Sequence, residues 1–178
     1  MKLRHLFFAC SGVFVMMFSL LLLVVIVFSD EEDGGSGGNL IYGGVSVSQE
    51  VLAHKPMLEK YAREYGIEEY LNVLLAIIQV ESGGTLEDVM QSSESLGLPP
   101  NSLSTEESIK QGCKYFSELL AAAETKGCDL NSVIQSYNYG GGFLDYVAVH
   151  GKKYTFELAE SFARDKSGGK KVTYTNPV

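Results

Sequence analysis

Histidine and cysteine are scarce in this chain, with three of each among its 178 residues. Cys113 and Cys128 have no histidine or further cysteine near them at the spacing that zinc ligands use. His54 and His150 are also isolated, and we interpret them as structural or surface groups. We therefore expect no metal site and no cofactor.

Basic residues are in the minority, with 14 lysines and arginines against 22 acids and a formal net charge of −8. Proteins that bind nucleic acid need a basic surface to neutralise phosphate groups. The charge balance argues against a nucleic acid partner.

The alternation of apolar and polar residues that is typical of β-strands is almost absent. The one possible exception is a short piece within residues 86–100. Apolar residues recur instead at the spacing of a helix face in most of the chain. We therefore expect an all-α fold.

An uncharged apolar run covers residues 6–28 and is long enough to cross a bilayer as a helix. Lys2 and Arg4 precede it and four acids follow at 30–33, so charge asymmetry predicts an inside N-terminus and an exported remainder. A cleaved signal peptide is the alternative, but the run is long for one and no clear cleavage site follows it. We interpret residues 1–29 as an anchor or uncleaved signal of a single-pass protein of the cell membrane.

Three further segments follow this run. Residues 30–45 read as an acidic Gly/Ser linker, 46–165 as one domain of ordinary size, and 166–178 as a flexible basic tail. Outside the cell, Cys113 and Cys128 could form a disulfide or stay as small buried thiols, and the sequence leaves both open.

Helix-start signals divide the domain into elements. Ser48, Ser104 and Asp129 are candidate N-caps, and Ser104 begins a Ser-Thr-Glu-Glu capping box. Pro56 should kink or restart the first helix. The expected helices cover residues 48–65, 68–82, 105–125, 130–137, 143–150 and 154–164.

The helix at 68–82 is nearly apolar all round, which predicts a buried central position. Glu81 continues the inward stripe of Leu74 and Ile78, so burial should raise its pKa. Gly83 and Gly84 can end the helix and leave this carboxyl at an open edge, as a general acid requires. The plainer alternative is a helix-end glutamate that reaches solvent.

Two other polar clusters lie where apolar elements give way to loop or glycine. Asp88 and Gln91 form one, and Ser136-Tyr137-Asn138 forms the other. Both could line one cleft with Glu81. The alternatives are a solvated loop acid at position 88 and a core aromatic at position 137.

Three motifs together resemble a known family. They are Glu-Ser-Gly-Gly at 81–84, Asp-Val-Met-Gln-Ser-Ser-Glu-Ser at 88–95 and Ser-Tyr-Asn-Tyr-Gly at 136–140. In this order and spacing they are similar to the lysozyme-like domain of the lytic transglycosylase superfamily. They are most similar to the muramidase domain of CwlT-type enzymes of Gram-positive conjugative elements. The resemblance covers roughly residues 46–162 and implies an all-α, goose-type lysozyme/SLT helical domain.

The resemblance also assigns roles to two acids. Glu81 matches the catalytic acid of the family. Asp88 matches a second acid that CwlT-type enzymes require and ordinary lytic transglycosylases lack. Inverting glycosidases hold their two carboxyls ~6.5–9.5 Å apart and retaining ones ~5–5.5 Å apart, a separation that the sequence leaves open.

The other matched positions are expected to bind substrate. Ser82 matches a serine that supports the reacting sugar, and Gln91 matches the glutamine of a Gly-Leu-Met-Gln motif in which Asp88-Val89 here replaces Gly-Leu. Tyr137 and Asn138 match an Ala-Tyr-Asn motif with serine in place of alanine. Gln91 and Asn138 have amides that can hydrogen-bond sugar substituents.

The implied function is hydrolysis of the β-1,4 bond between N-acetylmuramic acid and N-acetylglucosamine in peptidoglycan strands. The implied setting is local wall opening beside a conjugation or secretion apparatus. Two alternatives remain open: a lytic transglycosylase that forms 1,6-anhydro-muramyl ends, and a non-catalytic wall-binding scaffold. CwlT-type proteins carry a peptidase domain after this one, and we expect that second activity to be absent or encoded elsewhere.

Overall fold

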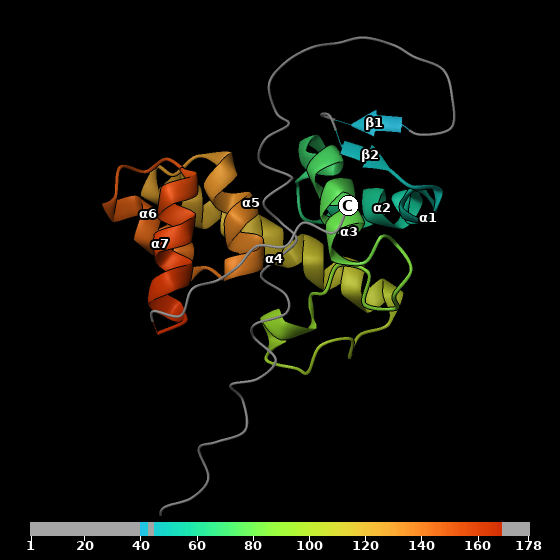
Figure 1. The fold of residues 1–178 in the computed structure, drawn as a ribbon. Helices are drawn as coiled ribbons and strands as arrows, with labels where there is room; N and C mark the ends of the chain where they lie inside the picture. Colours follow the sequence, from blue (N-terminus) through green and yellow to red (C-terminus); the bar gives the residue numbers. More distant parts are fainter. Residues whose placement is uncertain (1–39, 43–44, 169–178) are drawn as a thin grey trace, which may run out of the picture.

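The computed structural model describes residues 40–42 and 45–168, and helices dominate this part of the chain, as the sequence predicts (Figure 1). In chain order the elements are β1 (Leu40–Tyr42), β2 (Val45–Val47), α1 (Gln49–Ala53), α2 (Lys55–Glu64), η4 (Glu68–Tyr70), α3 (Leu71–Glu81), η5 (Ser93–Leu96), α4 (Thr105–Lys126), α5 (Leu130–Tyr139), α6 (Gly142–Val149) and α7 (Phe156–Lys166).

The membrane span expected at residues 6–28 lies outside the described residues, as does the tail beyond residue 168. Within the ranges that are described, no helix has the length and apolar character needed to cross a bilayer.

A short β-hairpin opens the described part. β1 and β2 pair antiparallel, with Leu40 opposite Val47, inside a stretch that we interpreted largely as linker. The expectation of a strand within 86–100 is wrong, because that segment contains only the 3-10 turn η5. Val47 is buried and β2 contacts α3, so tertiary packing rather than local alternation accounts for this hairpin.

The expected helix starts are confirmed. The Ser48 hydroxyl accepts a hydrogen bond from the Val51 amide, and Asp129 accepts one from the Ser132 amide at 3.0 Å. The Ser104 amide donates to the Glu107 carboxylate at 3.1 Å at the start of α4. The first expected helix divides in two, and Pro56 lies in the first turn of α2, where a missing amide hydrogen breaks no helical bond.

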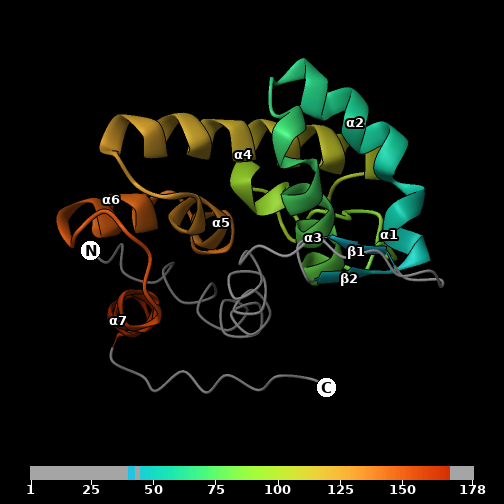
Figure 2. The same cartoon turned by 90° about the horizontal axis from the view of Figure 1, so that it is seen from above.

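Within the described ranges, helix α4 is the longest element and runs between two groups of elements. The hairpin and α1 to α3 lie toward one end of α4, and α5 to α7 lie toward the other, in both views (Figures 1 and 2). Its contacts include α2 on one side and α5 and α6 on the other. Any site formed by α3 and α5 therefore depends on α4 for its geometry.

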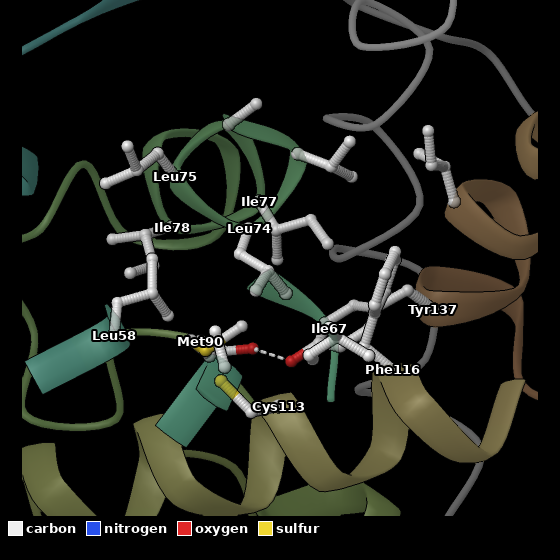
Figure 3. Packing of buried hydrophobic residues seen from close by; sticks show 14 of the residues in the cluster. Leu58, Ile67, Leu74, Leu75, Ile77, Ile78, Met90, Cys113, Phe116 and Tyr137 are labelled. Atoms are coloured by element: carbon white, nitrogen blue, oxygen red, sulfur yellow. Dashed lines mark hydrogen bonds between the residues drawn. The ribbon is translucent and has the colours of Figure 1, made fainter. Parts of the chain in front are cut away.

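The main core surrounds α3, whose residues 73–78 are all buried, as the sequence predicts (Figure 3). Phe116 and Cys113 from α4 pack against it. A second cluster of Phe143, Val147, Ala159 and Phe162 holds α6 and α7 together. Cys113 and Cys128 are both free thiols, so the structure has no disulfide between them.

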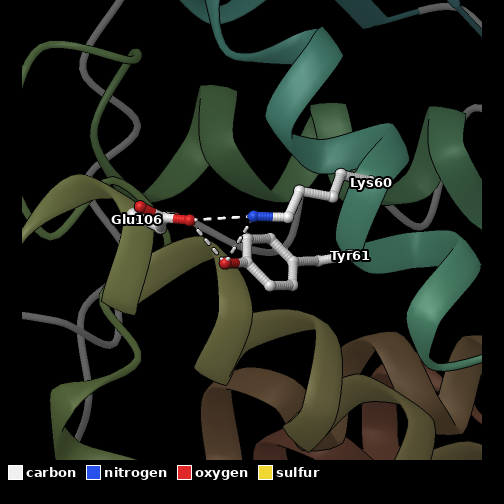
Figure 4. A network of polar contacts seen from close by, with 3 residues as sticks. All are labelled: Lys60, Tyr61 and Glu106. Atoms are coloured by element: carbon white, nitrogen blue, oxygen red, sulfur yellow. Dashed lines mark hydrogen bonds and ion pairs between the residues drawn. The ribbon is translucent and has the colours of Figure 1, made fainter.

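A polar contact fixes α2 against the start of α4 (Figure 4). The Tyr61 hydroxyl donates to the Glu106 carboxylate at 2.6 Å, and the Lys60 ammonium lies 3.0 Å from the same oxygen. Because α4 begins directly after the 82–104 segment, this contact also fixes the point at which that segment ends.

Candidate active site

Glu81 is the last residue of α3, and the chain turns sharply away after it. Gly83 and Gly84 have φ values of +60° and +78°, the left-handed region expected there. A Cβ on Gly84 would lie 2.7 Å from the Glu50 carbonyl carbon and the Val51 nitrogen, so only glycine fits against α1. A ring nitrogen of His54 also lies 2.9 Å from the Gly84 carbonyl oxygen. The end of α3 is thus fixed from the α1 side.

The Glu81 carboxyl is kept neutral by its surroundings. Burial raises its pKa from 4.5 to about 8, and the charges of Glu94 and Asp88 act in the same direction. A hydrogen bond with the Asn138 side chain lowers the pKa but does not outweigh burial. As predicted from the inward stripe, the residue is half-buried with a raised pKa, and it can hold a proton at neutral pH.

Residues 88–93, here called the site loop, accept hydroxyl hydrogen bonds from the C-cap of α3, from α4 and from α5. The Ser82 hydroxyl, at the end of α3, donates to the Val89 carbonyl at 2.7 Å. Ser108 on α4 donates to an Asp88 carboxylate oxygen at 2.6 Å. Tyr137 on α5 donates to the Met90 carbonyl at 3.0 Å (Figure 3). These three bonds attach the site loop to α3, α4 and α5.

Asp88, the first residue of the site loop, is fully buried, unlike the solvated acid considered as an alternative. One oxygen accepts from the Ser92 amide at 3.0 Å and from the Ser108 hydroxyl at 2.6 Å. The other accepts from the Ser93 amide at 3.2 Å and from the Ser93 hydroxyl. Both oxygens are therefore occupied by protein donors.

Gln91 has an unusual backbone conformation, with φ at +46° for a residue other than glycine. Its side-chain amide nitrogen donates to the Asp88 carbonyl and to the Asn101 side chain, both at 2.8 Å. Such conformations persist only where the surroundings impose them, and they concentrate at functional sites.

Tyr137 is 8% exposed, which fits the core-aromatic alternative for its location. Its ring packs on Tyr115 with centroids 5.5 Å apart. Burial raises the pKa of the Tyr137 hydroxyl, and the charges of Glu81 and Asp88 contribute. α5 continues to Tyr139, two residues further than predicted, and so carries Asn138 on a regular turn.

Four of the predicted site residues thus come together: Glu81, Asp88, Tyr137 and Asn138. Ser82 adjoins them, but its hydroxyl donates to the site loop and accepts from the Gly84 amide at 3.0 Å. Ser108 was missed by the sequence reasoning. It could have been recognised in the sequence as a serine on the apolar face of α4, four residues before Gly112. Across the described ranges, no group of histidine, cysteine and acidic side chains could hold a metal ion.

Comparisons with known proteins find similar sequences and a similar structure. The family described as Lysozyme-like matches residues 48–178. The bifunctional muramidase/DL-endopeptidase CwlT of Bacillus subtilis is 44% identical over 124 residues, which cover 69% of this chain and 37% of CwlT. The uncharacterized membrane protein YocA of the same species is 39% identical over 67% of this chain and 54% of its own length.

A solved structure is also similar. It is a crystal structure from Staphylococcus aureus described as similar to lipoprotein, NLP/P60 family, with 75% identity and a TM-score of 0.73. The match covers 75% of this chain and 45% of that one. The chain spans between about a third and just over half of the length of the curated relatives named here.

The family match extends over most of the chain and includes the acid, the site loop and the α5 motif. The chain therefore belongs to the lysozyme-like family, with a domain close to that of CwlT.

Proposed function

We propose that this protein is a peptidoglycan hydrolase of the N-acetylmuramidase type. Its substrate bond would be the β-1,4 linkage between N-acetylmuramic acid and N-acetylglucosamine. The observation that carries the proposal is the Glu81 carboxyl, whose pKa of about 8 keeps it protonated beside Asn138 at neutral pH. Membership of the lysozyme-like family and the similarity to CwlT support the same reaction class.

In this proposal Glu81 is the general acid. Cleavage of a glycosidic bond needs a proton for the departing oxygen, and an acid with a pKa near the working pH delivers it most effectively. Asn138 holds the carboxyl in place through its hydrogen bond. The Asn138 amide and the side-chain oxygen of Gln91, whose nitrogen already donates to Asp88 and Asn101, are proposed to contact the sugar substituents.

Asp88 is proposed to act as a fixed negative charge rather than as a base. Its oxygens accept from Ser92, Ser93 and Ser108, which leaves no free position for activating a water molecule. A buried carboxylate near the acid can stabilise positive charge that develops on the sugar. Ser82 and Tyr137 are proposed to support substrate binding through the position of the site loop.

The occupied Asp88 oxygens leave Glu81 as the base, because its carboxylate can take the proton of the nucleophile once its own proton has gone to the departing oxygen. If that nucleophile is the muramyl 6-hydroxyl instead of water, the protein is a lytic transglycosylase that forms 1,6-anhydro-muramyl ends. A non-catalytic wall-binding scaffold is the third candidate, and it predicts binding to peptidoglycan without any cleavage.

Product analysis separates these functions. Purified full-length protein is incubated with peptidoglycan, and the released fragments are measured by mass spectrometry. We expect soluble fragments with reducing muramyl ends, and Glu81→Gln should lower their release by at least about 10²-fold because the proton donor is lost. Glu87→Gln, at an exposed position before the site loop, is the matched control and should behave as wild type.

Each other result identifies an alternative. Anhydro-muramyl ends as the main product would replace hydrolysis by transglycosylation. Binding to peptidoglycan without release of fragments from any wall preparation would leave the non-catalytic scaffold as the function. Loss of activity in Glu87→Gln equal to that in Glu81→Gln would remove the special role of Glu81.

The proposal extends to location. Residues 6–28 would anchor the protein in the cell membrane with the domain on the wall side, where it would open the wall for conjugation or secretion. Protease treatment of intact protoplasts should degrade the domain while leaving an N-terminal tag protected. Protection of both parts would exclude this topology.

A further inference from the structure

Ser108 is a fully buried polar residue on α4 that makes three hydrogen bonds to the site loop. Its hydroxyl donates to the Asp88 carboxylate at 2.6 Å and accepts from the Met90 amide at 3.0 Å. Its backbone carbonyl accepts from the Ser92 hydroxyl at 2.9 Å. A single residue of α4 thus contacts three positions of the site loop.

The serine hydroxyl suits this place because it donates and accepts at once. Asp88 needs a donor and the Met90 amide needs an acceptor, and both groups are buried away from water. Removing the hydroxyl would leave the Met90 amide unsatisfied and take one of four donors from Asp88. Buried groups without partners favour rearrangement of the segment that carries them.

The neighbouring surface of α4 leaves room for the loop. Gly112 lies one helical turn after Ser108, and a Cβ there would lie 2.5 Å from the Met90 sulfur. Small residues at both positions allow the site loop to lie directly on the helix. Gln91, whose left-handed backbone conformation depends on its surroundings, follows Met90.

We infer that Ser108 is a positioning residue for the proposed reaction: it fixes Asp88 and the Met90 backbone on α4, and through them the charge and the loop beside Glu81. The inference rests on the proposed function. Ser108 bonds to the site loop and not to Glu81, so its effect on cleavage passes through Asp88 and Met90.

The first test is Ser108→Ala in the full-length protein, with kcat and KM for peptidoglycan cleavage measured separately. We expect kcat to fall by about 10²-fold, because a small displacement of aligned groups has an effect of that size, while a cooperative thermal transition is retained. Ser117→Ala, on the same helix α4, is the matched control. Its hydroxyl donates to the Lys114 carbonyl at 2.7 Å, so kcat should stay at the wild-type value.

A double-mutant cycle with Asp88→Asn tests whether Ser108 acts through Asp88. Once the carboxylate is gone, Ser108→Ala should lower kcat by less than the loss of about 10²-fold expected in the wild-type background, because coupled residues are not additive and the bond to Met90 is what is left to lose. Fully independent losses from the two substitutions would overturn the inference. A wild-type kcat in Ser108→Ala would overturn it as well.

Ser108→Cys keeps the test valid where alanine prevents folding. The thiol fills a similar volume but is a weak donor, so the variant should fold and show a reduced kcat. A wild-type kcat in this variant contradicts the inference. If the wild-type protein itself releases no fragments, it is the proposed function that fails. If the wild type cleaves and the Ser108 variants match it, the inference alone fails.

Discussion

Burial of the Glu81 carboxyl makes the free energy of unfolding depend on pH. In the unfolded chain this carboxyl ionises around 4.5, whereas in the folded protein burial delays ionisation until about pH 8. Between these values the folded state binds a proton that the unfolded state has released, so the free energy of unfolding decreases as pH rises. The group that suits the proposed chemistry therefore opposes folding at alkaline pH.

Glu81→Gln should remove this pH dependence. The amide stays neutral, so the variant should gain thermal stability relative to wild type between pH 5 and pH 9, with the larger difference at the alkaline end. Differential scanning calorimetry at several pH values measures it, and wild-type cleavage should fall over the pH range around 8 in which Glu81 ionises. A constant difference in melting temperature at all pH values would contradict the assignment.

The sequence revealed some of the site residues better than others. Glu81 could be predicted because its place on an apolar helix is a local property of residues 71–84. The burial of Asp88 could not, since it depends on how the site loop folds onto α4, and Ser92 and Ser93 have no recognisable pattern of their own. Ser108 was missed for the same reason: its partners are 15 or more residues away in the chain.

At the scale of elements, α4 has a glycine where helix propensity alone favours alanine. Gly112 is buried in the middle of this 22-residue helix. A Cβ there would lie 2.5 Å from the Met90 sulfur and 2.8 Å from the Tyr137 hydroxyl. Close approach of the site loop and α5, rather than helix stability, therefore accounts for the glycine.

Gly112→Ala should consequently destabilise the protein, by about 1–3 kcal/mol, as overpacking of a core usually does. The gain in helix propensity has the opposite sign, about 0.5–1 kcal/mol for glycine to alanine. Urea unfolding measures the sum, and cleavage should fall because the Tyr137 hydroxyl can no longer reach Met90. Gly142→Ala is the control, since its Cβ would meet Phe162 only at 4.0 Å. A more stable Gly112→Ala would show that propensity dominates.

Among the elements, the helices with caps were the most predictable from the sequence. Ser48, Ser104 and Asp129 each mark a start through a bond made within three residues. The hairpin was not predictable, because β1 and β2 have three residues each and one face of β2 is covered by the distant α3. Short strands that depend on non-local burial leave little signal in the local pattern.

At the scale of the whole molecule, packing rather than cross-linking holds the described part together. Cys113 is buried in the main core and Cys128 lies beside the second cluster, and neither forms a disulfide. Burial, with a smaller effect from Glu64, raises the pKa of the Cys113 thiol to about 12, so its reactive thiolate is rare at neutral pH.

We therefore expect the same melting temperature with and without a reducing agent. Alkylation of Cys113 by iodoacetamide, followed by peptide mass spectrometry, should be slow in the native protein and fast in denaturant. A melting temperature that falls by several degrees in reductant would indicate a disulfide between Cys113 and Cys128.

The attachment of residues 88–93 to three helices has a consequence for how such a protein can diversify. Residues 94–102 leave this anchored segment and run through mostly exposed positions before α4 begins. Glu94 and Asn101 act on Glu81 and Gln91, but side-chain exchanges at 96–100 would leave the acid and its supports unchanged. New wall preferences could therefore be selected in that stretch without rebuilding the chemistry, which makes it the natural target for a randomised library.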